Sequence, residues 1–204
     1  EAACQTGIPK IEEYNRGNNF GTAYVQMNQR RGKRCSAAHA FLNPARSRPN
    51  LTLLTHAAVQ GLELETIDGQ LRATGVRARL NGGAEQVFKA GREVVLAAGA
   101  IGSPQILQLS GIGPGPLLQQ RGVEVQRDLP GVGENLQDHL QIRTIYKVSN
   151  TVTLNQLYNS LWGKLGMGLQ YLLFRKGPLT MPPSQLGAFA MSDPDQLTPN
   201  MEWH

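Results

Sequence analysis

Apolar and polar residues alternate along the middle of the chain, between two short runs that are mainly apolar. The alternating stretches cover residues 59–65, 71–80 and 86–90, and this pattern predicts strands that bury one face. Asp68-Gly69 and Asn81-Gly82 separate the stretches, and both dipeptides favour two-residue hairpin turns. The sequence therefore predicts a β-meander in this region.

The two flanking runs, residues 51–55 and 94–98, contain few polar positions. Short runs of this kind are typical of strands that are buried on both faces, as in a parallel sheet. We therefore expect a buried strand on each side of the meander.

The second run leads through a glycine-bearing turn into a predicted helix. Ser103 is a favourable N-cap, and Pro104 suits the first helical position because no helical bond needs its N–H there. Gly111 or Gly113 can end the helix in a left-handed turn. A strand, a glycine turn and a helix start in this order direct backbone N–H groups toward an anionic or polar cofactor.

By itself this junction is a weak signal of function. Gly99-x-x-Gly102 differs from the G-x-G-x-x-G dinucleotide fingerprint, and similar junctions that bind nothing are common. The same small residues would also allow a helix to pack tightly on a sheet. From the residues alone, cofactor binding and packing remain equal alternatives.

Elsewhere the pattern predicts short elements separated by turns, as 23 glycines and 12 prolines indicate. Residues 1–22 complete a short helix and continue as an irregular loop. Further helices are expected at residues 36–42, 115–122 and 154–173, the last broken near Gly163, Gly166 and Gly168, and further strands at 123–125, 141–148 and 186–191.

Composition and charge exclude several classes of protein. A 40 % hydrophobic content is enough for a core, and no run approaches the roughly 20 apolar residues of a membrane span. The net charge is +5, with a basic group at residues 30–34, but no nucleic-acid-binding motif accompanies it. We interpret the group as solvated surface and expect no nucleic-acid partner. Cys4 and Cys35 lack the spacing of a disulfide framework, which favours free thiols in a reducing compartment.

Motifs for hydrolysis, metal binding or nucleotide hydrolysis are missing from the sequence. G-x-S-x-G, H-E-x-x-H and a Walker loop do not occur. His39, His56 and His204 are isolated, so we expect no metal site. Asp138-His139 resembles a catalytic dyad, but adjacent residues on a strand point apart. We interpret the pair as structural, with a supporting role near a cofactor as the alternative.

Two longer strings carry a resemblance to a known family. Residues 99–113 read GAIGSPQILQLSGIG, and residues 129–139 read LPGVGENLQDH. They resemble the second signature region of the glucose–methanol–choline (GMC) family of FAD-dependent oxidoreductases, and within it the choline dehydrogenase and alcohol dehydrogenase (acceptor) branch. Residues 32–44 and 48–55 are similar to the family segment that precedes a strand of the FAD domain. The resemblance covers essentially the whole chain.

The resemblance implies FAD as cofactor and a set of cofactor-binding residues, namely Val59, Ala98, Gly99, Ala100 and Ser103. Main-chain N–H and C=O groups of Val59 would pair with the adenine edge of FAD. The small residues from Ala98 to Ala100 would lie against its adenosine half. Ser103 would act first as the helix cap. The resemblance implies no catalytic residue within this chain.

For the fold, the resemblance implies a mixed α/β chain in two parts. Residues 1–139 would be part of an FAD/NAD(P)-binding Rossmann-like domain, with an irregular segment at 1–50, a strand and the inserted β-meander at 51–98, and the signature turn and helix at 99–113. Residues 140–204 would begin an antiparallel-sheet substrate domain. The family's G-x-G-x-x-G loop and catalytic histidine are not in this sequence, so we expect a central fragment of a longer enzyme.

For function, the resemblance implies oxidation of an alcohol, choline or another primary alcohol, by hydride transfer to flavin. The electron acceptor would be oxygen or a quinone. The fragment alone would be inactive and prone to self-association. We expect a cytoplasmic protein, with peripheral association with the inner membrane left open. Two alternatives remain: a non-catalytic binding domain on the GMC scaffold, and a flavin-retaining hydroxynitrile lyase.

Overall fold

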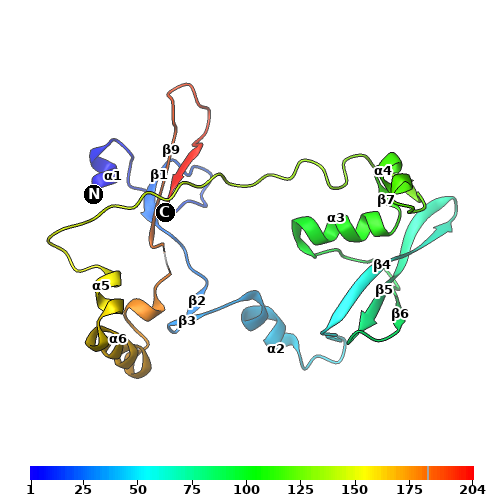
Figure 1. Ribbon diagram of the computed structural model, residues 1–204, viewed down its shortest axis with the longest axis horizontal. Coiled ribbons are helices and arrows are strands. Elements are labelled where there is room, and N and C mark those ends of the chain that lie inside the picture. Colours follow the sequence, from blue (N-terminus) through cyan, green and yellow to red (C-terminus); the bar gives the residue numbers. More distant parts are fainter. Residues whose placement is uncertain (183) are drawn as a thin grey trace. The chain divides into compact units, whose positions relative to one another are not determined.

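The computed structural model describes residues 1–182 and 184–204 (Figure 1). The chain forms two compact units, which we describe separately. Unit 1 combines Glu1–Leu51 with Tyr146–His204, and unit 2 is Thr52–Ile145. This grouping by contacts joins residues 1–51 to the C-terminal part, whereas the sequence suggested one part at 1–139. The assignment of these parts to cofactor and substrate remains a prediction.

Unit 2 is built on a three-stranded antiparallel sheet. Its strands are β4 (Ala57–Ile67), β5 (Gln70–Leu80) and β6 (Glu85–Lys89), in the order β4-β5-β6. The structure confirms the predicted meander (Figure 1). It also confirms the first hairpin turn, because Asp68 and Gly69 adopt φ angles of 51° and 73°, the left-handed values that a two-residue turn requires.

Two irregularities interrupt the pairing of β4 with β5. The register shifts between Val59 and Gly61, and again between Glu63 and Leu64. The first shift leaves Gln60 without a partner on β5, and the second leaves Thr74 of β5 without one on β4. Such bulges increase the local twist and redirect side chains.

Helix α3 (Gly99–Leu109) confirms the predicted helix but not its start. Ala98, not Ser103, is the N-cap residue, and Pro104 lies inside the helix. The Ser103 hydroxyl instead accepts the N–H of Ala98 at 3.0 Å and so stabilises the first turn from within. Pro104 removes only the donor to the Ala100 carbonyl, and the helix continues through it.

The end of α3 agrees with the sequence. Ser110 is the C-cap, and Gly111 follows with φ 82°, the left-handed conformation predicted for this position. Three short elements complete unit 2: β7 (Ile112–Gly113), α4 (Gly115–Gln120) and β8 (Arg127–Asp128). Strand β8 pairs in parallel with β7 and follows the segment 123–125, where the sequence suggested a strand.

Four predicted strands are not strands in the structure. Residues 51–55, 94–98, 123–125 and 141–148 have no strand assignment, and Val95 is 77 % exposed. A strand needs hydrogen-bonded neighbours for its backbone groups, and no described residue pairs as a strand with these four segments. Their apolar pattern is therefore present without the sheet that it requires.

Unit 1 contains a second antiparallel sheet, which joins distant parts of the chain. Strands β1 (Gly21–Tyr24), β9 (Leu186–Ala190) and β10 (Met201–Trp203) follow the order β1-β9-β10. Tyr14 supports this sheet, because its hydroxyl accepts the N–H of Ala23 at 2.7 Å and donates to the Gly187 carbonyl. Its ring lies edge-on to Phe189, with centroids 4.9 Å apart.

The remaining elements of unit 1 are short, apart from one helix. The basic group at residues 30–34 forms the hairpin of β2 (Gln29–Arg30) and β3 (Lys33–Arg34). The expected helix at 36–42 is a π-helical turn, η1 (Ala38–Leu42). The other helical elements are α1 (Ala2–Gln5), α2 (Asn43–Ala45), α5 (Leu154–Asn159), α6 (Leu161–Phe174) and the 3₁₀ turn η2 (Pro178–Thr180).

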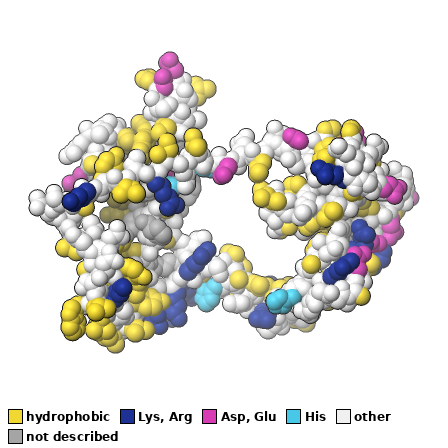
Figure 2. All heavy atoms as spheres, viewed as in Figure 1, with side chains coloured by type: hydrophobic (Ala, Val, Ile, Leu, Met, Phe, Trp, Pro, Cys, Tyr) yellow, Lys and Arg dark blue, Asp and Glu magenta, His cyan; other side chains and the backbone are white. Residues whose placement is uncertain are grey.

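Helices α5 and α6 confirm the predicted helical stretch, but it breaks at Ser160 rather than at the glycines. Thr153 caps α5 in a capping box with Gln156, and the Ser160 hydroxyl caps α6. Apolar side chains cover much of the surface of α6 (Figure 2). Trp162, on this helix, is 82 % exposed. Within the described residues, no helix has the length and apolar character needed to cross a bilayer.

A substitution at Gly111 tests how α3 ends. A Cβ there would lie 2.3 Å from the Glu124 carbonyl oxygen, in addition to the strain of φ +82°. We expect Gly111→Ala to lower the free energy of unfolding by about 2 kcal/mol or more, since a left-handed alanine and a steric overlap both contribute. Denaturant unfolding measures this change.

Gly122→Ala is the matched control. Gly122 also has positive φ, +71°, but a Cβ there would meet no described atom within 4 Å. It should cost only the backbone strain, about 1 kcal/mol. Equal effects of the two substitutions would contradict the packing argument.

Candidate functional site

The corner between the second apolar run and α3 is open in the structure. Ala98, Gly99 and Ala100 are all exposed. Gly99 has φ +82°, and a Cβ built on it would meet no described atom within 4 Å. The main chain at this corner is therefore not covered by side chains, and a flat ligand could lie directly against it.

Backbone donors gather at the same corner. The first amides of an α-helix have no acceptor within the helix, and they carry the positive end of its dipole. At α3, the N–H of Ala98 is bonded to the Ser103 hydroxyl at 3.0 Å. The next amides of the first turn, those of Gly99, Ala100 and Ile101, have no acceptor within the helix and are available to an external one.

Val59 lies on β4, the strand against which α3 packs. It stands opposite Ala78 at the first register shift and is 38 % exposed. Among the described residues, β4 pairs with β5 alone, so its other edge is free of strand partners. The structure thus places Val59 in the same unit as the α3 corner, on a strand with an unpaired edge.

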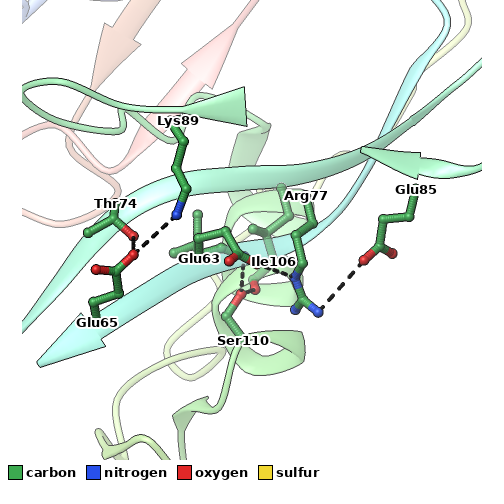
Figure 3. A network of polar contacts seen from close by, with 9 residues as sticks. Glu63, Glu65, Thr74, Arg77, Glu85, Lys89, Ile106 and Ser110 are labelled. Carbon is green, nitrogen blue, oxygen red and sulfur yellow. Dashed lines mark hydrogen bonds and ion pairs between the residues drawn. The ribbon is translucent and has the colours of Figure 1, made fainter. Parts of the chain in front are cut away.

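One hydroxyl group connects this strand to the helix. Ser110, at the end of α3, is buried at 7 % exposure. Its Oγ accepts the N–H of Leu62 on β4 at 2.8 Å and donates to the carbonyl of Ile106 at 2.6 Å (Figure 3). The hydroxyl therefore uses both its donor and an acceptor position within the junction.

Gly61 lies directly beside this contact. A Cβ at Gly61 would lie 2.7 Å from Nη2 of Arg77 and 3.2 Å from Oγ of Ser110. A side chain there would require the end of Arg77 to move and would crowd the Ser110 hydroxyl. We call Gly61, Leu62, Arg77 and Ser110 the strand–helix junction.

Arg77 also forms ion pairs within the sheet (Figure 3). Its Nε lies 3.2 Å from Oε1 of Glu63, and its Nη1 lies 3.9 Å from Oε1 of Glu85. The Nε group is buried without a well-directed hydrogen bond, so the contact with Glu63 is mainly electrostatic. All three side chains are partly exposed, and pairs of this kind contribute about 0–1 kcal/mol each.

A second ion pair lies along the same sheet. Glu65 Oε1 accepts from the hydroxyl of Thr74 at 2.9 Å and from Nζ of Lys89 at 3.1 Å (Figure 3). The Thr74 hydrogen bond, followed by the hydrogen bond and charge of Lys89, lowers the pKa of Glu65 below its ordinary value of 4.5. Thr74 occupies the second bulge, which directs its hydroxyl to Glu65.

Asp138 and His139 do not form a catalytic pair. The Asp138 carboxylate accepts the backbone N–H of His139 at 2.8 Å, and both residues are exposed. Among residues 1–182 and 184–204, no cluster of three or more His, Cys, Asp or Glu side chains is arranged to hold a metal ion.

Sequence reasoning missed Ser110 and Gly61 as members of this site. The hydroxyl of Ser110 bonds an amide 48 positions away in the sequence, and no local pattern signals such a partner. Ser110 lies in the string at residues 99–113, which carries the family resemblance, but the sequence assigned Ser110 itself no role beyond its place near the end of a helix.

Comparison with known proteins identifies a family and several relatives. A family model described as GMC oxidoreductase matches residues 1–141. Oxygen-dependent choline dehydrogenases of Pseudomonas putida and Pectobacterium atrosepticum are 37 % and 39 % identical to the chain over 208 aligned positions. The alignments cover 100 % of the chain and 36 % of each relative. The chain therefore spans about a third of the length of the curated relatives it matches.

Solved structures give the same result. An FAD-dependent oxidoreductase from Chaetomium thermophilum is similar with a TM-score of 0.80 and 28 % identity, over 92 % of this chain and 33 % of that one. A fungal aryl-alcohol oxidase is similar with a TM-score of 0.78 and 26 % identity, over 92 % of this chain and 32 % of that one.

The pKa of Glu65 gives a prediction about pH. Because the folded protein favours ionised Glu65, its contribution to stability is complete above pH 4.5, the ordinary pKa, and is lost as the pH falls through the lower folded pKa. Glu65→Gln should therefore be less stable than the wild type near neutral pH, and the difference should shrink on acidification. Thermal unfolding at a series of pH values measures it.

Thr74→Val removes the main cause of the lowered pKa and serves as the control. In the Thr74→Val background, Glu65→Gln should have a smaller effect at neutral pH. An effect of Glu65→Gln that is the same at every pH would contradict this account.

Proposed function

The chain belongs to the GMC oxidoreductase family, and on this basis we propose that it is part of an enzyme that oxidises an alcohol with a bound FAD. The observation that supports the proposal most strongly is the open corner at Ala98–Ala100. It lies on the helix that is joined to the strand of Val59.

The residues present fit an FAD at this corner. A dinucleotide needs an approach to bare main chain, and Gly99 supplies one because a Cβ there would meet no described atom within 4 Å. The free amides at the start of α3 suit the polar groups of the adenosine half. When bound, FAD supplies the redox chemistry by accepting a hydride equivalent from the substrate.

We propose that five residues bind the cofactor. Ala98, Gly99 and Ala100 would line the adenosine half, and Ser103 would keep the first turn of α3 in place through its bond to Ala98. Main-chain groups of Val59 would pair with the adenine edge, which leaves its side chain to pack within the sheet. These roles use backbone geometry rather than acid–base chemistry.

We further propose choline or another primary alcohol as the substrate. The support is the sequence identity of 37 % with a relative named oxygen-dependent choline dehydrogenase. The same name favours oxygen over a quinone as the electron acceptor. The proton-accepting histidine and the phosphate-binding loop would lie in the part of the longer enzyme that the present sequence does not cover. This chain would supply the cofactor's adenosine site and part of the substrate region.

A pair of substitutions at Gly99 tests the cofactor assignment in the full-length enzyme. Gly99→Ala and Gly99→Leu impose the same backbone strain, because both place a side chain at φ +82°. They differ in how far the side chain enters the open space. We expect Gly99→Leu to raise the Kd for FAD at least about tenfold above that of Gly99→Ala, the cost of losing one good contact. Flavin fluorescence titration measures both values.

Gly91→Leu is the control, since a Cβ at Gly91 also meets no described atom and its φ is not positive. It should leave the Kd for FAD unchanged. Equal affinities of the Gly99→Ala and Gly99→Leu enzymes would remove the main support for an FAD site at this corner.

The isolated chain should behave differently from the whole enzyme. We expect residues 1–204 to show no choline-dependent dye reduction and only weak FAD binding. Exposed apolar side chains, such as Trp162, should promote self-association. Dye reduction assays and light scattering test these expectations, and turnover by a monodisperse monomer would contradict them.

A further inference from the structure

We infer that Ser110 is a positioning residue for the cofactor, because it holds the two elements of the proposed adenosine site in a fixed relation. The inference rests on the proposed function. It concerns how β4 and α3 are held together, not which groups touch the cofactor.

Ser110 forms the hydrogen bond that joins the two elements. Among the hydrogen bonds and ion pairs of the described residues, the bond from Leu62 N–H to Ser110 Oγ, at 2.8 Å, alone links β4 to α3. The second bond of the hydroxyl, to the Ile106 carbonyl at 2.6 Å, fixes its orientation on the helix. Ser110 is 7 % exposed, so water does not readily replace it.

Two neighbouring residues, Gly61 and Arg77, fit closely around the Ser110 contact. A Cβ at Gly61 would press on both Arg77 and Ser110, at 2.7 Å and 3.2 Å. Arg77 is itself held by Glu63 at 3.2 Å. The helix end therefore rests against bare strand backbone, with an arginine held beside it by a carboxylate.

Distances along the two elements connect the junction to the proposed site. Val59 stands three residues before Leu62, about 10 Å along an extended strand. Gly99 stands eleven residues before Ser110, about 16 Å along a helix. Both elements are regular over these lengths, apart from the bulge at Gln60. A shift at Ser110 would therefore displace the Gly99 corner relative to Val59.

The test uses the full-length enzyme and two probes, ADP for the adenosine half and riboflavin for the flavin half. Ser110→Ala leaves the buried N–H of Leu62 without an acceptor. We expect it to weaken ADP binding about tenfold, because the α3 corner would shift relative to β4, and to leave riboflavin binding unchanged. Gly61→Ala, which disturbs the junction without removing a polar group, should shift the two affinities in the same way.

Thr74→Ala is the matched control. It removes one hydrogen bond from the same sheet, that to Glu65, but none from α3. It should lower the unfolding temperature without changing the Kd for ADP. If Ser110→Ala does not fold, Gly61→Ala provides the same measurement.

Each outcome decides between the alternatives. Weakened ADP binding in the junction variants, with Thr74→Ala unchanged, would support the inference. Wild-type affinity for ADP in a folded junction variant would overturn it, as would an equal loss of both probes or an equal effect of Thr74→Ala. A wild-type enzyme that binds FAD but not ADP would overturn it as well. A wild-type enzyme that binds neither would overturn the proposed function itself.

Discussion

A strand at the edge of a sheet has backbone amides that no neighbouring strand satisfies, and in unit 2 this constraint is met by a helix. The N–H of Leu62 is bonded to the hydroxyl of Ser110 at 2.8 Å, in a region that excludes most water. A buried amide without an acceptor costs about 1–3 kcal/mol, so the hydroxyl at the end of α3 stabilises this edge of the sheet. The absence of a side chain at Gly61 leaves the Ser110 hydroxyl and the end of Arg77 uncrowded beside the strand.

The position of the open corner follows from this contact. Since α3 is a regular helix from Gly99 to Leu109, fixing its end also fixes its start. The start needs little further support, because Ser103 satisfies the N–H of Ala98 from within the helix. Small residues then leave the main chain uncovered at the corner where we propose contact with the cofactor. The small residues at Ala98–Ala100 do not serve tight packing, because all three are exposed and α3 is bonded to the strand at its other end, through Ser110.

Some of the strongest sequence patterns have no counterpart in the structure. Residues 51–55 and 94–98 carry the apolar pattern of buried strands, yet no described residue pairs with them. Helix α6 likewise exposes much of its apolar surface. An apolar pattern indicates that a segment is suited to burial, but burial itself requires another strand or helix that packs against it. Among the described residues, no such partner covers these segments.

The sequence by itself determined the local features of this protein. Alternation and the Asp68-Gly69 turn predicted the meander, because both act over a few residues, and the string at residues 99–113 identified the family. The sequence did not determine where α3 begins, because Ser103 is a good N-cap in isolation and its bond to Ala98 depends on the folded turn. Only the tertiary structure decided that Ser110 and Gly61 belong to the site, and that Tyr14 supports the sheet of unit 1. These contacts join residues far apart in the chain, and no local pattern of polarity encodes which distant amide a hydroxyl will meet.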